Sequence, residues 1–203
     1  MPDVSENYVD QGLHALEGGD YSTAIDVFTK ALRLSLGDLA EIHYRRGVAY
    51  WGLNDDEQAL ADWDEALRRN PYHSAAYYER AQVWEQRGND EAAAQDYSRA
   101  VTLNPRMAEG WFARGLLYER LGHLEAADHD FTQALRLQED MVLAYEARGR
   151  VRAARRAYDG AIADLREYLK RGGGHTYDNQ SETQSHILSL RVTRVILRLL
   201  RLY

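Results

Sequence analysis

The chain has 203 residues, 45% of them hydrophobic, and its 25 lysines and arginines against 32 acidic residues give a formal net charge of −7. It contains no cysteine, which excludes disulfides and thiolate zinc sites and fits a reducing compartment. The first residues lack the basic and apolar runs of a signal peptide, and no apolar stretch reaches the roughly 20 residues that span a bilayer. We therefore expect a soluble, cytoplasmic protein.

The charge is unevenly distributed along the chain. Residues 1–38 hold seven acids against two bases, a balance of −5, whereas residues 142–171 hold eight bases against four acids, a balance of +4. Residues 181–203 hold four arginines against one glutamate, a balance of +3. An acidic start and a basic end bear on partners or self-association rather than on the fold.

A set of landmark positions recurs every 34 residues. In the third copy these are Tyr77, Ala81, Trp84, Gly88, Ala93, Tyr97 and Ala100, and in the fourth Trp111, Gly115, Tyr118, Gly122, Ala127, Phe131 and Ala134. A period of roughly 20–50 residues is the signature of a stacked repeat array. The sequence predicts five copies, at residues 5–38, 40–73, 74–107, 108–141 and 142–171.

Each copy is expected to form two helices joined by a tight turn. In the third copy Tyr77, Ala81 and Trp84 lie at positions i, i+4 and i+7, which is one face of a helix. Gly88 then supplies the left-handed conformation that ends a helix, and Pro105 stops the second helix. One helix pair cannot bury its apolar face alone, so the pairs are expected to stack.

A column of small residues and a column of large ones run along the copies. The small residues are expected to let the two helices of a copy approach closely, and the large ones to fill the space between copies. The small column is Gly12, Gly47, Ala81, Gly115 and Gly149, and the large column is Phe28, Trp63, Tyr97, Phe131 and Leu165.

These positions, with the closing Pro71 and Pro105, resemble the tetratricopeptide repeat family over residues 5–171. The resemblance implies an all-α, right-handed superhelical solenoid of antiparallel helix pairs whose first helices line a concave groove. It also implies a scaffold or adaptor that binds a peptide or helix in that groove. The fifth copy diverges most, with Arg152 at an aromatic position and Tyr168 at a small one. Whatever stacks on this copy must sit differently from a sixth repeat.

After the fifth copy, residues 172–180 form a glycine-rich, polar linker, and residues 181–203 an amphipathic helix that caps the array or mediates oligomerisation. The arginines from Arg191 to Arg201 form one narrow stripe, and nearly all the remaining circumference is apolar. Because a cap buries only one face, this apolar surface implies a second buried contact. The residues assigned to these contacts are Leu188, Val192, Val195, Ile196, Leu199 and Leu200.

No arrangement typical of catalysis is present. The sequence has no nucleophile motif, no glycine-rich phosphate loop and no His-Glu-x-x-His motif. The closest histidines, His123 and His129, are expected to be surface residues rather than metal ligands. Acids such as Asp55 and Asp62 are expected at helix starts and solvated outer faces. We therefore predict no enzymatic activity, no catalytic residue, no metal and no cofactor.

The expected groove is lined by aromatic side chains with charged neighbours. Its predicted residues are Tyr44, Val48, Trp51, Tyr78, Gln82, Glu85, Phe112, Leu116 and Glu119. Two interpretations remain open: the aromatics grip a peptide or helix, or they pad the packing between first helices. The groove lacks the lysines and asparagines with which some family members hold a chaperone carboxylate, so we predict against that mode. An apolar ligand with some basic residues suits it best.

The run from Arg148 to Arg156 is the strongest local charge signal. Its basic patch, Arg150, Arg152, Arg155 and Arg156, would meet an acidic protein surface, or be solvated or paired within the fold. Nucleic acid is disfavoured because few aromatics are near and the chain is acidic. Arg148 recurs as Arg46, Arg80 and Arg114, which predicts that these arginines pair with an acid of a neighbouring helix.

Three functions remain in contention. The first is a non-enzymatic adaptor that binds a protein segment in the groove. The second is self-assembly, through the apolar C-terminal helix or through contact between the acidic start of one copy and the basic end of another. The third is peripheral attachment to a membrane by the arginine-striped helix, which the breadth of its apolar arc disfavours.

Overall fold

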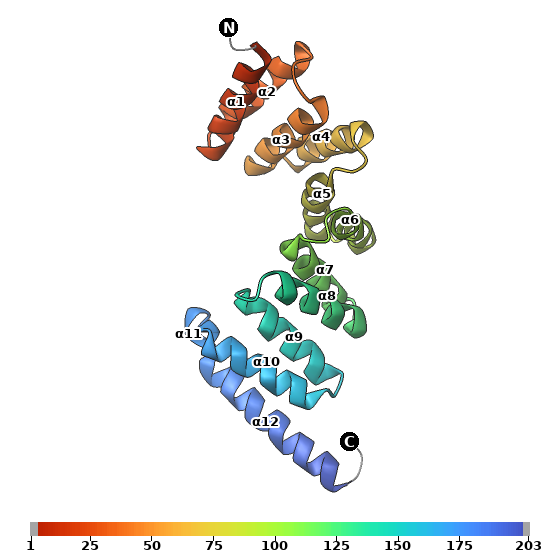
Figure 1. Cartoon of the computed structure of the whole chain (residues 1–203), viewed down its shortest axis with the longest axis vertical. Coiled ribbons are helices and arrows are strands. Elements are labelled where there is room, and N and C mark those ends of the chain that lie inside the picture. Colours follow the sequence, from red (N-terminus) through yellow and green to blue (C-terminus); the bar gives the residue numbers. More distant parts are fainter. Residues whose placement is uncertain (1–3, 201–203) are drawn as a thin grey trace. The chain divides into compact units, whose positions relative to one another are not determined.

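The computed structural model describes residues 4–200, which form α-helices joined by short turns (Figure 1). The chain divides into two compact units, one ending at Asn104 and one beginning at Pro105. Each unit is a stack of antiparallel helix pairs, so the predicted all-α tetratricopeptide solenoid is confirmed. Within residues 4–200, no helix combines the length and the apolar character needed to cross a membrane.

The helices follow one another along the chain in antiparallel pairs. The first unit contains α1 (Val4–Glu17), α2 (Tyr21–Arg33), α3 (Leu39–Gly52), α4 (Asp56–Arg69), α5 (Ser74–Gln86) and α6 (Asp90–Leu103). The second unit contains α7 (Ala108–Arg120), α8 (Leu124–Leu137), α9 (Val142–Ala154), α10 (Tyr158–Lys170), α11 (Gly173–Thr176) and α12 (Gln180–Leu199). Residues 201–203 of the predicted last helix lie outside the described residues.

The small and large columns meet inside each helix pair. A Cβ atom on Gly47 would lie 2.6 Å from the Trp63 ring, and one on Gly115 would lie 2.7 Å from the Phe131 ring. The glycines therefore let a second-helix ring lie directly on the first helix. The large residue also faces the next pair, as predicted, because Trp63 shares a buried cluster with Ala76 and Val83 of α5.

A buried aspartate on each later second helix is held by an arginine of its own pair. The pairs are Arg46 with Asp62, Arg80 with Asp96, Arg114 with Asp130, and Arg148 with Asp164. In each, the arginine Nε and Nη2 both donate to the carboxylate, at 2.7 to 3.0 Å. The prediction that these arginines pair with an acid of a neighbouring helix is confirmed.

Arg46 and Arg148 also reach the preceding helix pair. The Arg46 Nη1 donates to Thr29 on α2 at 3.0 Å, and the Arg148 Nη1 donates to Thr132 on α8 at 3.2 Å. The Arg46 and Arg148 clamps therefore also tie their own pair to the one before it. The expectation that Asp62 is solvated on an outer face is wrong: Asp62 is 4% exposed, because its carboxylate is enclosed by these donors.

The end of the second unit is built around Tyr168. This side chain is fully buried, and its hydroxyl donates to Asn179 at 2.9 Å. A Cβ atom on Gly173 would collide with the Tyr168 ring, so a glycine turn is required beside it. That turn forms the short helix α11, and α12 begins at Gln180, so the predicted linker 172–180 is partly helical. The fifth copy is thus followed by a structure unlike a sixth repeat, as expected.

α12 runs alongside α10 and covers it (Figure 1). Ile187 and Leu190, each 7% exposed, pack with Ile162 and Leu165 of α10. Arg194 and Arg198 both form ion pairs with Asp159. One face of α12 therefore caps its own array.

The turn between the two helices of a pair needs a left-handed residue at one fixed position. That position is Asn54, Gly88, Gly122 and Arg156 in successive copies, with φ between 60° and 78°. A non-glycine side chain in this conformation costs roughly 1–2 kcal/mol, and asparagine tolerates it better than arginine. Arg156 is therefore the most strained residue of the four.

We expect Arg156→Gly to raise the free energy of unfolding by about 1 kcal/mol, because glycine adopts this conformation without a steric penalty. Urea unfolding followed by circular dichroism measures it. Gly122→Arg is the converse control and should lower stability by a similar amount. A destabilised Arg156→Gly variant would mean that contacts of the Arg156 side chain outweigh its backbone strain.

We expect Asp164→Ala to lower the free energy of unfolding by about 3 kcal/mol, because it removes the carboxylate that the partly buried Arg148 and Arg152 share. Glu125→Ala, which removes an 80% exposed partner of Arg155, should cost less than about 1 kcal/mol. Equal losses in the two variants, measured by denaturant unfolding, would refute the structural role of the buried clamp.

Candidate protein-interaction surfaces

The predicted groove residues of the first unit lie on α3 and α5. We call this surface the α3–α5 face and define it by Tyr44, Val48, Trp51, Tyr78, Glu79, Gln82 and Glu85. These residues differ in burial and in the partners that they contact.

Tyr44 is part of the packing. It is only 9% exposed, the His73 ring lies 4.5 Å from it between centroids, and the Arg45 guanidinium covers it at 5.3 Å. Burial, together with the nearby Glu79 carboxylate, raises the pKa of Tyr44 to about 12. For this residue the padding interpretation describes the structure.

Val48 and Trp51 line an open hollow of about 350 Å³. Tyr21, Gly52, Asn54, Asp56 and Gln86 complete its walls. Trp51 also contacts the buried Trp63 edge-on, with ring centroids 6.4 Å apart. Both predicted residues are half-buried and border space that a ligand side chain can enter.

Tyr78 and Glu85 meet at the second helix of their pair. The Tyr78 ring is tilted against the buried Tyr97 at 5.9 Å, and the Tyr97 hydroxyl donates to Glu85 at 2.9 Å. Tyr78 keeps a partly exposed ring, whereas Tyr97 is 1% exposed. This part of the face therefore combines an aromatic surface with a fixed carboxylate.

Glu79 was expected from the sequence as one of the groove's charges but was not among the predicted site residues. Its carboxylate is largely buried and accepts a hydrogen bond from the Gln82 amide at 2.8 Å. Burial raises its pKa to about 7, and the Gln82 hydrogen bond opposes this only in part. Among the groups that shift the pKa of Glu79 there is no cation within the described residues. Glu41 on α3 differs, because His73 and Arg45 lower its pKa to about 2. The α3–α5 face therefore carries a carboxylate whose charge is poorly compensated.

In the second unit the corresponding residues are Phe112, Leu116 and Glu119, and the charge of Glu119 is balanced by an arginine. Phe112 packs on the buried Phe131 at 5.7 Å, and Leu116 joins the same cluster. Glu119 accepts two hydrogen bonds from Arg150, each 3.0 Å long, and Arg150 also pairs with Glu146. A glutamate at this position is thus balanced within the fold.

The predicted basic patch is largely engaged in ion pairs. Besides Arg150, Arg152 pairs with Asp128 and Asp164, and Arg155 pairs with Asp128 and Glu125. Arg156 is exposed at its strained turn. The internally paired alternative therefore describes three of the four arginines, and a role for the patch in partner binding remains a prediction.

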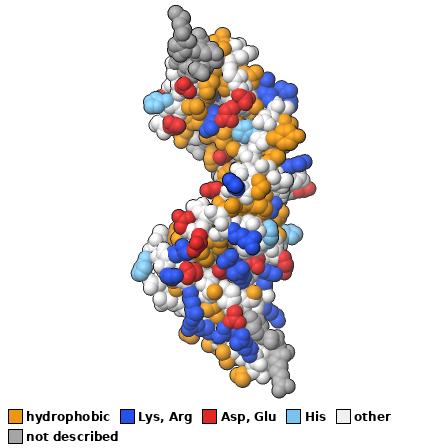
Figure 2. All heavy atoms as spheres, viewed as in Figure 1, with side chains coloured by type: hydrophobic (Ala, Val, Ile, Leu, Met, Phe, Trp, Pro, Cys, Tyr) orange, Lys and Arg blue, Asp and Glu red, His pale blue; other side chains and the backbone are white. Residues whose placement is uncertain are grey.

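The outer face of α12, opposite α10, is apolar. We define it by the six residues assigned to this role from the sequence, which are Leu188, Val192, Val195, Ile196, Leu199 and Leu200. Their side chains are 48–78% exposed. Figure 2 shows hydrophobic side chains next to arginines at this end of the molecule. The inner face caps the array, and the outer face has no cover among the described residues.

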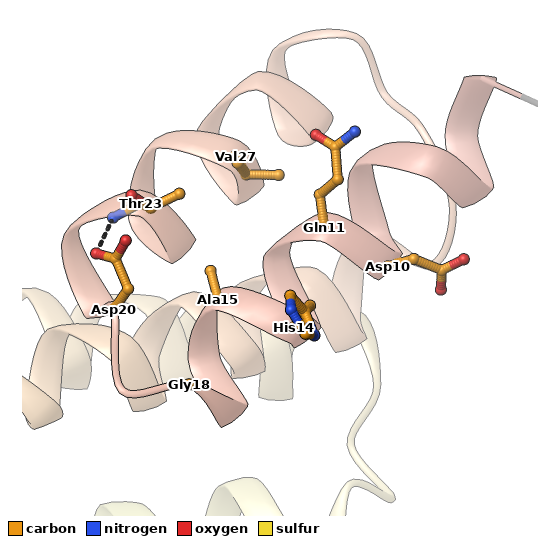
Figure 3. A pocket seen from close by; sticks show the side chains of 8 residues that line it. All are labelled: Asp10, Gln11, His14, Ala15, Gly18, Asp20, Thr23 and Val27. Carbon is orange, nitrogen blue, oxygen red and sulfur yellow. Dashed lines mark hydrogen bonds between the residues drawn. The ribbon is translucent and has the colours of Figure 1, made fainter.

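A hollow of about 630 Å³ lies on α1 and α2 and was not predicted. Figure 3 shows Gln11, Ala15 and Val27 gathered between the two helices, with Asp10 and Asp20 at opposite ends. Asp20 caps α2 by accepting from the Thr23 amide at 3.1 Å. The repeat pattern could have indicated this hollow, because Gln11 and Val27 occupy the positions at which later copies have the clamp arginine and aspartate.

The histidines that were weighed as metal ligands have other neighbours. His123 lies against the Tyr118 ring, and His129 lies against Trp111 and contacts Asp130. Within residues 4–200, no group of three or more histidines and acids is arranged to hold a metal ion.

Known proteins match parts of this chain. Tetratricopeptide repeat profiles match residues 9–63, 44–108 and 108–141. Heat shock protein STI1 of Saccharomyces cerevisiae is 32% identical over 74 residues, 36% of this chain and 13% of that protein. Photosystem I assembly protein Ycf3 of Prochlorococcus marinus is 30% identical over 82 residues, 39% of this chain and 47% of that protein. The chain thus spans less than half of either relative.

Solved structures show the same fold. A MamA protein aligns with a TM-score of 0.72 at 20% identity, covering 87% of this chain and 96% of that one. A tetratricopeptide repeat protein from Parabacteroides merdae aligns with a TM-score of 0.71 at 19% identity, covering 93% of this chain and 79% of that one. Together with the profile matches across residues 9–141, the stacked helix pairs establish that the chain belongs to the tetratricopeptide repeat family.

Proposed function

We propose that the chain is a non-enzymatic adaptor whose α3–α5 face binds a protein segment with a basic side chain flanked by apolar ones. The observation that supports this most is Glu79, a largely buried carboxylate that accepts a hydrogen bond from a glutamine and, within the part of the chain that the structure describes, forms no ion pair. Burying an anion without a counter-ion is costly, and a ligand cation would relieve that cost.

The surroundings of Glu79 supply the rest of the ligand's chemistry. Tyr78 offers a partly exposed ring, on which the stem of an arginine or lysine can pack. Val48 and Trp51 border a hollow that suits an apolar neighbour of that residue. The acidic character of the face also disfavours a ligand that ends in a carboxylate. This agrees with the prediction from the sequence that the groove does not hold a chaperone carboxylate.

The relatives support a role in holding proteins rather than converting substrates. One is named as a heat shock protein and another as a photosystem I assembly protein. Each match covers only part of those proteins, so the relatives support no more than the proposal that this chain is a scaffold. The proposed basic charge of the ligand rests on Glu79 alone.

The raised pKa of Glu79 makes a prediction about stability. Between the ordinary value of 4.5 and the folded value of about 7, the folded chain retains a proton that the unfolded chain has lost. This group therefore destabilises the fold increasingly as the pH rises through that window. We expect Glu79→Gln to gain about 1–3 kcal/mol relative to the wild type on going from about pH 5 to about pH 8, measured by urea unfolding. A constant difference would show that Glu79 is ordinarily solvated.

Binding is tested with a displayed peptide library selected on the full chain. We expect enriched peptides to carry arginine or lysine between apolar residues, and Glu79→Gln to weaken them about tenfold, because a buried charge pair is lost. Binding should also release a proton near pH 7, since the ligand cation lowers the pKa of Glu79; calorimetry in buffers of different ionisation enthalpy detects this.

Glu91→Gln is the matched control, because it removes the same charge from an exposed position on α6. It should leave the affinity unchanged. Selected peptides without basic residues, or equal losses in both variants, would contradict the assigned role of Glu79.

A further inference from the structure

The outer face of α12 is arranged to pack against another helix surface. Leu188, Val192, Val195 and Leu199 recur at i, i+4, i+7 and i+11, which places them in one stripe. They are 61%, 51%, 48% and 78% exposed. A contiguous exposed apolar surface commonly marks an interaction site, so we expect another surface to pack against this stripe.

The α1–α2 hollow is the surface on which a helix would stack in this array. His14 lies in the hollow at the position that later copies fill with Ala49, Val83 and Val151. Those three residues are 0–1% exposed, because each packs on the preceding helix pair; Ala49, for example, lies in the cluster of Phe28. In the first pair this position is exposed, so α1 and α2 present an open stacking face.

The floor of this stacking face is apolar because the clamp of the later copies is absent from it. Val27 stands where the clamp aspartate does, and with Ala15 it forms part of the floor, while Asp10 and Asp20 supply carboxylates at its ends. An apolar helix with basic flanks fits such a surface better than a neutral or acidic one.

Charge decides between the two ways in which copies of this chain can meet. Pairing α12 with α12 would bring together two helices that each hold three arginines against one glutamate, whereas pairing α12 with residues 1–38 brings a charge of +2 to one of −5. The second arrangement joins two different surfaces, so the assembly keeps one unused α1–α2 hollow at one end and one unused outer face of α12 at the other, where further copies can add.

We infer that the outer face of α12 in one copy seats on the α1–α2 hollow of a second copy, giving head-to-tail chains. This goes beyond the proposed ligand of the α3–α5 face, since neither surface contains Glu79.

The test uses light scattering coupled to size exclusion on the full chain. The tail variant Val192→Ser/Val195→Ser/Leu199→Ser removes the stripe and keeps the inner contacts of Ile187 and Leu190. The head variant Asp10→Arg/Thr23→Arg fills and recharges the hollow at two exposed positions. The matched control Glu91→Arg/Thr102→Arg makes the same changes at exposed positions of α6.

The wild type and the control are expected to grow in mass with concentration, and less so when salt shortens the Debye length from about 10 Å to about 3 Å. Each variant alone should remain a monomer. An equimolar mixture of head and tail variants should give a dimer and stop there, because only one intact surface of each kind remains. Circular dichroism verifies that each variant is folded.

A wild type that stays monomeric overturns the inference, as does a mixture that fails to associate. If the tail variant is monomeric while the head variant associates like the wild type, α12 pairs with α12 instead. If the wild type stays monomeric but floats with vesicles of phosphatidylcholine and phosphatidylserine, and the tail variant does not, the stripe is a membrane contact. Peptide binding at Glu79 should persist in both variants, which separates failure here from failure of the proposed function.

Discussion

The bidentate clamp between an arginine of the first helix and an aspartate of the second is the interaction on which the array depends. A carboxylate as buried as Asp130, at 1% exposure, is tolerated only when donors surround it. Because the clamp fixes the two helices of a pair and also reaches the preceding pair, it sets both the packing within a repeat and the stacking between repeats. Its absence from the first pair, at Gln11 and Val27, is what leaves a hollow there.

The clamp also explains why local charge is a poor guide to the surface. The run from Arg148 to Arg156 is basic in sequence, yet Arg148 and Arg152 share Asp164, and Arg150 is taken by Glu119 and Glu146. These arginines stabilise the fold because each pairs with an acid on another helix. Glu79 is the converse case: it belongs to an unremarkable mixed sequence, but neighbouring helices bury it without a cation.

The repeat period predicted the helix pairs and the columns of contacts within them, because both depend on residues at fixed spacing. The same reasoning identified all six exposed residues of the outer α12 face. It could not predict that Tyr44 is covered by His73, that Asp62 is buried, or that Gly173 begins a helical turn beside Tyr168. These depend on side chains brought together by tertiary packing. The α1–α2 hollow was accessible in principle, since it lies where two repeated columns change residue type.

The two proposed surfaces act on different scales, and their combination has a physical consequence. The α3–α5 face is complete within one copy, so a single copy can hold one segment with the modest affinity expected of a small, partly polar site. If copies join end to end, each adds another such face to the same assembly. A partner with several basic segments would then engage neighbouring faces at high effective concentration, and its apparent affinity would rise steeply with chain length without any new contact. Self-association would in that case control ligand binding, even though the two surfaces share no residue.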